Sequence, residues 1–369
     1  MNDSVNDRPD IERGRDGAAP AAVDVSPSVG LEKSQRPSIA GRLSGQLRIW
    51  IGVLIGAVFL WWAFRQVEDI NRVLANLRQA NYLLVLPAIG IFFLDVFFRS
   101  LRWQVLLSPM RRLPVGELFR ALVIGFTVND VLPARLGELA RAYLLGRRTG
   151  MSKSAVLATI VVERLFDGIT MFILLAMVGL FTGLESDVRV AMRVAGVIFL
   201  GGAAVLVLAA TGPKRALAVL GALLSPVPSP LRARALAVAE RFIGGLAVLQ
   251  SVRLIGLILL LSMAAWGLEA LMYLLIGQGF NLGVRPTAYL MMLAVVNLGT
   301  MIPGTPGYVG TFQGLSVFSL GLFGVAPDDA LGYSFVLHAA LLVPVTLMGF
   351  FYLGRYNLSL TSLVKERER

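Results

Sequence analysis

The stretch Leu132-Pro-Ala-Arg-Leu-Gly-Glu-Leu-Ala-Arg141 places a proline, a glycine and three charged residues directly after an apolar run. In the hydrocarbon core of a bilayer, each unsatisfied backbone group or stranded charge costs roughly several kcal/mol. A charged helix break in a chain built for lipid is therefore retained for a purpose. It predicts a protein-lined cavity, a re-entrant turn or a substrate path at this point.

The composition around this stretch is that of a membrane protein. The 369 residues are 56% hydrophobic, with a mean hydropathy of +0.72. Only 15% of them are charged, against roughly 25% in soluble domains. Long apolar runs recur without the alternation of barrel strands, which predicts an all-α polytopic membrane protein and excludes a β-barrel.

The charge balance and the missing residue types exclude several function classes. A net charge of +11 would indicate nucleic acid in a soluble protein, but here Lys and Arg lie in loops between apolar runs. There is no cysteine and only one histidine, His338, so thiolate catalysis, disulfides and a zinc site built from His or Cys are excluded. No phosphate loop of the Walker type occurs. We therefore predict no nucleic-acid partner, no metal and no cofactor.

The chain divides into three predicted parts. Residues 1–46 are polar, have no apolar core like that of a signal peptide, and predict a disordered cytoplasmic tail. Residues 47–355 form the transmembrane domain, and residues 356–369 form a basic cytoplasmic tail. Full crossings are predicted at 47–64, 82–107, 155–183, 190–210, 254–276 and 329–353. The connection 211–253 predicts amphipathic helices on the bilayer surface.

The basic residues assign the loops to two sides of the membrane. Lys and Arg cluster in loops 99–117, 135–153 and 211–253, which we place in the cytoplasm together with both termini. The outer loops are 184–193, 277–285 and 324–329. The weak point is 65–78, which must face out yet carries three arginines.

This assignment turns two shorter apolar runs into broken segments. Both loops that flank 118–132 belong inside, so this run dips in from the cytoplasm and returns. By the same parity, 288–323 dips in from the outside or crosses as a tight pair. About six full transmembrane helices plus two broken re-entrant segments of opposite entry are the arrangement expected of an inverted repeat.

The first polar cluster surrounds the opening stretch. Pro133 starts a new helix, whose N-terminus suits an anion such as a lipid phosphate. Arg135, Glu138 and Arg141 share one helical face because they are spaced by three. The alternative is an interfacial helix with snorkelling arginines. The cluster consists of Asn129, Asp130, Pro133, Arg135, Gly137, Glu138 and Arg141.

Two further charged groups lie in predicted spans. Glu163, Arg164 and Asp167 leave one carboxylate unpaired within their helix, free to pair with Arg135 or Arg141, carry a proton or meet a cation. The alternative is a structural ion pair near the interface. Asp95, Arg99, Arg102 and Trp103 share a face that predicts a basic wall of the same cavity, or an intrahelical Asp–Arg pair.

The second break is uncharged. Two prolines and three glycines within residues 303–310 cannot form a regular helix, and such breaks persist in a membrane only inside protein or beside water. The alternative is an external loop between two ordinary spans. We expect Glu269 and His338, isolated in later spans, to be packing residues. The polar set around the break is Asn297, Thr300, Pro303, Thr305, Pro306, Gly307, Gly310 and Gln313.

Four motifs carry a resemblance to a known family: Arg99-Ser-Leu-Arg-Trp103, Leu132–Arg141, Ala158-Thr-Ile-Val-Val-Glu-Arg-Leu-Phe-Asp167 and Pro303-Gly-Thr-Pro-Gly-Tyr-Val-Gly310. Over roughly residues 45–355 the chain resembles the lysylphosphatidylglycerol synthase transmembrane-region family, also called the flippase-like domain or UPF0104 type. The resemblance implies a flippase-like protein, since the best-known members move an aminoacylated anionic lipid between leaflets. The family pattern often has Glu after the second break, where Gln313 stands here.

The resemblance also implies that this chain cannot make lysyl-lipid by itself. The aminoacyl-transferase domain of the synthases is missing from the sequence, as is the N-terminal glycosyltransferase domain of some relatives. We predict that the chain is not an enzyme and moves a polar-headed phospholipid, anionic or aminoacylated, between leaflets of the cell membrane. Its arginines would grip the lipid phosphate, and its carboxylates would meet a cationic headgroup or a coupling ion.

Two rival functions stay open. The first is a membrane-embedded enzyme on a lipid-linked substrate, with Glu163 or Asp167 as base. The second is a non-transporting partner that recruits a separate lipid-modifying synthase through the basic 211–253 surface. Predicted partners are membrane lipids, such a synthase and a second copy of this chain. The predicted substrate-binding residues are Arg99, Arg102, Asn129, Arg135, Glu138, Arg141, Glu163, Arg164, Asp167, Asn297, Pro303, Thr305, Gly307 and Gln313.

Overall fold

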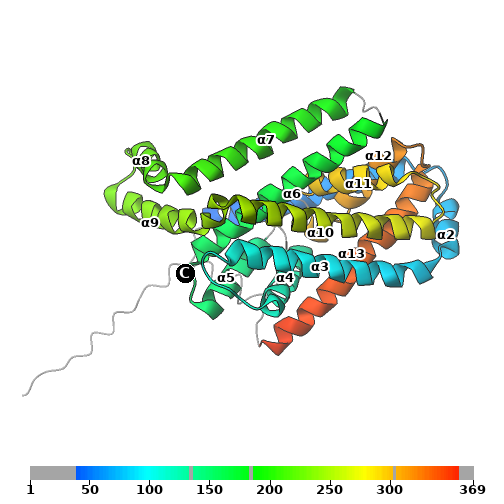
Figure 1. Ribbon diagram of the computed structural model, residues 1–369. Helices are drawn as coiled ribbons and strands as arrows, with labels where there is room; N and C mark the ends of the chain where they lie inside the picture. Colours follow the sequence, from blue (N-terminus) through cyan, green and yellow to red (C-terminus); the bar gives the residue numbers. More distant parts are fainter. Residues whose placement is uncertain (1–38, 133–135, 183–185, 302–304, 357–369) are drawn as a thin grey trace, which may run out of the picture. The chain divides into compact units, whose positions relative to one another are not determined.

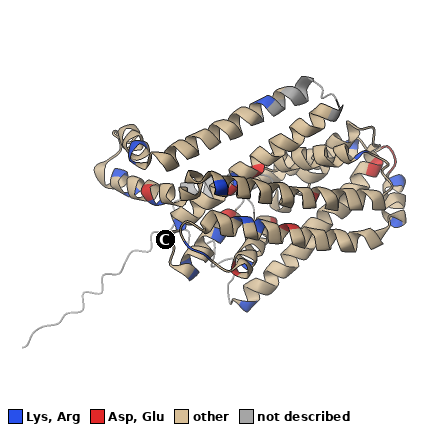
Figure 2. Cartoon of the chain, in the orientation of Figure 1, with Lys and Arg blue, Asp and Glu red and all other residues tan. Residues whose placement is uncertain are grey.

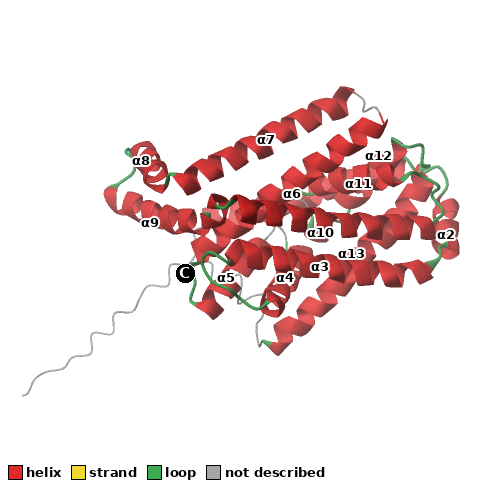
Figure 3. Ribbon diagram, in the orientation of Figure 1, coloured by secondary structure: helices red, strands yellow, loops and turns green. Residues whose placement is uncertain are grey.

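The chain folds into helices joined by short turns (Figure 1). The computed structural model describes residues 39–132, 136–182, 186–301 and 305–356, and the described residues from 43 onward form one compact unit. These residues contain helices and no strand, which confirms the all-α prediction (Figure 3). Most of the predicted tails, 1–46 and 356–369, lies outside the described residues. The first helix begins at Ile39, before the predicted start at residue 47.

The elements follow in chain order. They are α1 (Ile39–Arg65), α2 (Ile70–Gln79), η1 (Tyr82–Leu84), α3 (Val85–Leu107), α4 (Val115–Val131), α5 (Gly137–Thr149), α6 (Lys153–Thr182), α7 (Ser186–Thr211), α8 (Pro213–Leu223), α9 (Ser229–Gly245), η2 (Ala247–Gln250), α10 (Val252–Gly279), α11 (Pro286–Gly299), η3 (Pro306–Tyr308), α12 (Thr311–Gly321) and α13 (Pro327–Arg355).

Several of these helices have the length and hydropathy of membrane spans. Among the described residues, three are long and apolar enough to cross: α3 together with η1, α10 and α13. Two bent pairs, α1 with α2 and α7 with α8, raise this number to five. The remaining predicted span, 155–183, corresponds to α6, which has 30 residues but carries the charged residues Glu163, Arg164 and Asp167. The chain is thus a polytopic membrane protein.

One end of the bundle collects the predicted outer loops. Arg72 of α2 pairs with Asp329 at the start of α13 at 2.9 Å. The backbone N–H of Asn81 donates to the carbonyl of Gly279, at the end of α10, over 2.9 Å. Segment 65–78, the weak point of the charge count, therefore lies with 277–285 and 324–329 as the parity required. The positive charge of Arg72 in this segment is paired there with Asp329.

The opposite end collects the predicted cytoplasmic loops. Arg111 donates to the carbonyl of Thr149 at 2.6 Å, and Gln250 donates to that of Ala210 at 2.7 Å. Helix α8 turns by 109° from α7, as expected of a helix that leaves the membrane for its surface. Lys and Arg mark α8 and α9 at this end and α2 at the other (Figure 2).

Both predicted broken segments form helical hairpins. Helix α4 packs against α5, and α11 packs against α12. Helix α5 has 13 residues and α12 has 11. Both are too short to cross the hydrocarbon core alone, since a span needs about 20 residues. The α4–α5 hairpin opens toward the basic end, where Arg111 meets Thr149. The α11–α12 hairpin opens toward the end that holds α2, so the two hairpins enter from opposite ends.

The tips of the hairpins meet in the middle of the bundle. Gly307 of η3 lies so close to α4 that a Cβ atom on it would be 3.3 Å from the carbonyl oxygen of Asp130. Helix α13 contacts this junction, since its Thr346 donates to the Asp130 carboxylate at 2.7 Å. Two breaks far apart in the chain thus form one feature. Whether the hairpins are related by inverted-repeat symmetry stays a prediction.

Candidate functional site

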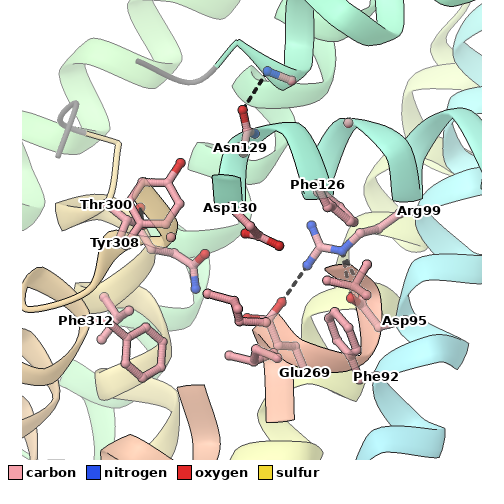
Figure 4. A pocket seen from close by; sticks show the side chains of 18 of the residues that line it. Phe92, Asp95, Arg99, Phe126, Asn129, Asp130, Glu269, Thr300, Tyr308 and Phe312 are labelled. Atoms are coloured by element: carbon pink, nitrogen blue, oxygen red, sulfur yellow. Dashed lines mark hydrogen bonds and ion pairs between the residues drawn. The ribbon is translucent and has the colours of Figure 1, made fainter. Parts of the chain in front are cut away.

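A polar cavity lies where the two hairpin tips meet (Figure 4). Its volume is about 190 Å³, and its wall is built by α3, α4, α5, α6, α10, α11, η3, α12 and α13. Aromatic rings make up much of the wall, among them Phe92, Phe126, Trp266, Tyr273 and Phe312. Polar groups interrupt them, so the cavity combines apolar surface with hydrogen-bonding groups deep inside an apolar bundle.

The structure sorts the predicted site residues into four groups. Seven line the cavity: Arg99, Asn129, Glu138, Arg141, Arg164, Asn297 and Gly307. Three are buried and do not line it: Arg102, Glu163 and Asp167. Two, Thr305 and Gln313, make local contacts at the second break. Arg135 and Pro303 lie outside the described residues. That these residues bind substrate stays a prediction.

An ion-pair network joins α3 to α6. Arg102, fully buried, donates to Asp167 at 2.6 Å and to Ser262 of α10 at 2.9 Å, and lies 3.4 Å from Glu163. The indole N–H of Trp266 donates to the same Asp167 oxygen at 3.0 Å. These carboxylates are therefore held behind the cavity wall by partners within the protein.

The hairpin helix α5 joins this network. Arg141 presents both terminal nitrogens to the Glu163 carboxylate, at 3.3 and 3.2 Å, and its guanidinium lies over the ring of Trp103 at 4.8 Å. Arg164 contacts Glu163 at 2.9 Å and Asp167 at 3.4 Å. Several roles were left open for the unpaired carboxylate of α6. The structure shows one of them, the pairing of Glu163 with Arg141.

A second ion-pair group crosses from α3 to α10. Arg99 Nε donates to both oxygens of Asp95 at 2.8 Å, and its Nη2 donates to Glu269 at 2.7 Å. Its guanidinium lies over the Trp266 ring at 4.0 Å. The intrahelical Asp95–Arg99 pair and the basic wall are thus both present. Glu269, expected to be a packing residue, lines the cavity as the partner of Arg99.

These pairings change the role expected of the arginines. Four arginines, Arg99, Arg102, Arg141 and Arg164, face the carboxylates of Asp95, Glu163, Asp167 and Glu269. The guanidinium groups predicted to grip a lipid phosphate are already engaged within the protein. An incoming phosphate would compete with these carboxylates for the guanidinium groups.

The second break is held by Gln313 and His338. The Gln313 side-chain oxygen accepts from the backbone N–H of Gly310 at 2.8 Å, and its nitrogen lies 3.0 Å from His338 Nδ1. The imidazole stacks on Phe312, with ring centroids 4.3 Å apart. Gln313 thus caps the N-terminus of α12. His338, expected to be a packing residue, also lines the cavity.

Thr305 and Asn129 stabilise their own hairpins. Thr305 donates to the carbonyl of Val309 at 2.6 Å and faces α1, where a Cβ atom on Gly56 would overlap it. Asn129 of α4 accepts from the backbone N–H of Gly137 at 2.7 Å, which satisfies one free donor at the start of α5. Both polar residues have local partners in addition to any role toward a ligand.

Comparison with known proteins assigns the chain to a family. The model of the lysylphosphatidylglycerol synthase transmembrane region matches residues 49–349. The chain belongs to this family. The match begins in α1 and ends in α13, so it includes every element that lines the cavity. The resemblance found in the four sequence motifs is therefore confirmed.

Curated relatives align with this chain to different extents. Glycosyltransferase AglD of Haloferax volcanii is 27% identical over 89% of this chain and 58% of its own length. A UPF0104 membrane protein of Methanothermobacter thermautotrophicus is 30% identical over 33% of this chain and 36% of its own. Another, from Methanocaldococcus jannaschii, is 36% identical over 16% of this chain and 26% of its own. The chain spans less than two thirds of each relative.

One of these relatives overturns the prediction that the chain is not an enzyme. It aligns over 89% of this chain and is named a glycosyltransferase. The prediction was therefore wrong.

Proposed function

We propose that this member of the lysylphosphatidylglycerol synthase transmembrane-region family holds a polar lipid headgroup in the cavity while the lipid moves between leaflets. One observation carries the proposal: two helical hairpins that enter from opposite ends meet at Asp130 and Gly307 in the wall of one polar cavity. Transporters place substrate sites near the membrane midplane, at broken helices of this kind.

The size of the cavity supports a headgroup as the ligand. Its volume of about 190 Å³ is below the roughly 300–1,000 Å³ of sites that enclose a drug-sized molecule. A whole lipid cannot enter it. A headgroup can, if the acyl chains remain in the bilayer beside the helices.

The charges of the cavity limit which headgroups it would bind. The ionisable residues of the cavity and its network are four arginines and six carboxylates, because Asp130 and Glu138 add to the four paired acids. Among the described residues, carboxylates therefore outnumber cations by two. A site with this excess of carboxylates favours a neutral or cationic headgroup over a multiply charged phosphate. Aromatic rings and the amides of Asn129 and Asn297 suit the same groups.

Filling the cavity is expected to stop lipid movement. In Asn297→Phe, a ring replaces a small amide that lines the cavity and occupies much of its volume. Vesicles of phosphatidylglycerol and phosphatidylethanolamine that contain the purified chain and a fluorescent lipid report movement as loss of protection from a membrane-impermeant quencher. We expect the wild type to accelerate exchange at least tenfold over protein-free vesicles, and Asn297→Phe to abolish this acceleration.

The matched control is Val197→Phe, the same new side chain at a site on α7 that is 75% exposed. It should exchange lipid at the wild-type rate. Exchange that is no faster with wild-type protein than without it, for every lipid in a panel of phospholipids and a glycosylated polyprenyl phosphate, contradicts the proposal. Equal rates for Asn297→Phe and wild type would remove the cavity from the path.

A second candidate is a membrane-embedded step of group transfer on a lipid-linked substrate, favoured by the relative named a glycosyltransferase. Glu163 and Asp167, the bases first considered, are paired with arginines and do not line the cavity. Asp130 lines it and has no arginine partner among the described residues, so it is the better base. This candidate predicts a change of lipid mass in a mass spectrum, whereas transport leaves every mass unchanged.

The topology is proposed as both termini in the cytoplasm of the cell membrane, on the positive-inside distribution of the loops. The chain has no cysteine, so single cysteines report sidedness without background. In intact cells a membrane-impermeant maleimide should label Gln79→Cys, at the end of α2, and spare Arg234→Cys, on α9. Both positions are exposed, and both should react after lysis. The reverse pattern would invert the assignment.

A further inference from the structure

Among the described residues, Asp130 and Glu138 are the carboxylates of the cavity network that have no cationic partner. Asp95 and Glu269 bind Arg99, Glu163 binds Arg141, and Asp167 binds Arg102. Asp130 accepts one hydrogen bond, from Thr346 of α13 at 2.7 Å, and no Lys, Arg or His of the described chain lies within ion-pair distance.

Asp130 also occupies a distinctive position in the fold. It lies in the last turn of α4, at the tip of one hairpin, and its backbone oxygen faces Gly307 at the tip of the other. Figure 4 shows its carboxyl group pointing from α4 into the cavity. A change of charge at Asp130 therefore acts where the two hairpins and α13 meet.

Among the described residues, the cations of this cavity are already paired. The ionisable groups that line it together with Asp130 come from α3, α5, α6, α10, η3 and α13: Asp95, Arg99, Glu138, Arg141, Arg164, Glu269, Tyr273, Tyr308 and His338. Arg99 is bound between Asp95 and Glu269, Arg141 pairs with Glu163, and Arg164 contacts Glu163 and Asp167. His338 has its Nδ1 against Gln313 and its ring stacked on Phe312. The remaining groups are acids or phenols, which cannot neutralise a carboxylate.

A carboxylate in an apolar bundle without a cation is costly, and binding a proton removes that cost. A metal ion is a poorer occupant, because the described residues contain no group of three His, Cys, Asp or Glu side chains able to hold one. The Thr346 hydroxyl supplies one donor, which leaves the second carboxyl oxygen free to take a proton.

We propose that Asp130 is a proton-binding site whose protonation controls the junction of the two hairpins. A proton from water bonds to the free oxygen and gives a neutral carboxylic acid; its return to water restores the carboxylate. Thr346 acts as a positioning residue that keeps the group turned into the cavity. Coupling of this step to headgroup movement rests on the proposed function, whereas proton binding itself does not.

Infrared difference spectroscopy tests the site directly. Spectra of the full-length chain in lipid, recorded through a pH titration, should contain the carbonyl band of a buried carboxylic acid, which shifts in heavy water. We expect Asp130→Asn to lose this band and Thr346→Val to keep it with a displaced midpoint. The matched control is Asp329→Asn, which alters the exposed carboxylate paired with Arg72 and should leave the band unchanged.

Four outcomes separate the alternatives. A band that persists in Asp130→Asn overturns the proposal. Loss of the band on replacing choline with sodium at constant ionic strength and pH assigns the site to sodium and also overturns it. In the vesicle assay, a pH gradient should change the wild-type exchange rate and leave that of Asp130→Asn unaffected. Loss of the band in Asp130→Asn, without lipid exchange by the wild type, upholds the proton site and rejects the proposed function.

Discussion

Replacing Asp167 with alanine is expected to destabilise the folded bundle by about 3–5 kcal/mol, the cost of leaving a buried charge without its partner. Arg102 is fully buried and makes its shortest ion pair, 2.6 Å, with this carboxylate. Arg164 and the indole N–H of Trp266 lose the same partner. Glu163 remains, but it already serves Arg141 and Arg164 and lies 3.4 Å from Arg102.

The measurement is the free energy of unfolding in mixed micelles, with the exposed pair between Arg72 and Asp329 as control. Asp329→Ala should cost about 0–1 kcal/mol, since water and salt screen an exposed pair. The double variant Asp167→Leu with Arg102→Met should recover much of the loss, because an apolar pair of similar volume removes both charges together. A loss for Asp167→Ala no larger than that of the control would show that the network contributes little to stability.

Replacing Gly137 with alanine is expected to separate the limbs of the α4–α5 hairpin. A Cβ atom at this position would overlap the carbonyl oxygen of Gly125 and lie 2.6 Å from the side-chain oxygen of Asn129. Backbone atoms of α4 cannot move aside as a flexible side chain can. Overpacking of this kind costs about 1–3 kcal/mol, and here it also displaces the acceptor of the Gly137 N–H.

Both the unfolding free energy and the lipid exchange rate should fall in Gly137→Ala, since Asn129 and Arg141 flank the same contact. Gly90→Ala in α3 is the control, because nothing lies within 4 Å of a Cβ atom there. It should be as stable as the wild type or more stable by about 1 kcal/mol, the helix propensity difference. Equal stability of the two variants would mean that the hairpin limbs do not pack this closely.

Local patterns in the sequence were sufficient for the class of fold. Apolar runs, the two proline- and glycine-containing breaks and the uneven distribution of Lys and Arg predicted a helical membrane protein with two broken segments of opposite entry. These features are visible locally because a bilayer constrains length, hydropathy and charge over a few turns of chain. The motifs at 132–141 and 303–310 also located the two tips that line the cavity.

The partners of the charged groups were beyond local patterns. Glu269 and His338 looked isolated because Arg99 lies 170 residues from Glu269, and because the break that carries Gln313 lies one helix away from His338. The arginines of α3, α5 and α6 looked available for phosphate, but packing brings α6 and α10 carboxylates against them. Asp130, one polar residue among several in sequence, combines the lack of such a partner among the described residues with a position where the two hairpins and α13 meet.

Sequence therefore determined the elements of this protein and its family, since each depends on residues close together in the chain. Tertiary structure decided which charges cancel, and which residues share the cavity. An ion pair in an apolar bundle forms between whichever helices the packing brings within a few ångströms, and spacing along one helix does not encode that choice. The meeting of Asp130 with Gly307, and with it the candidate site, exists only in the folded chain.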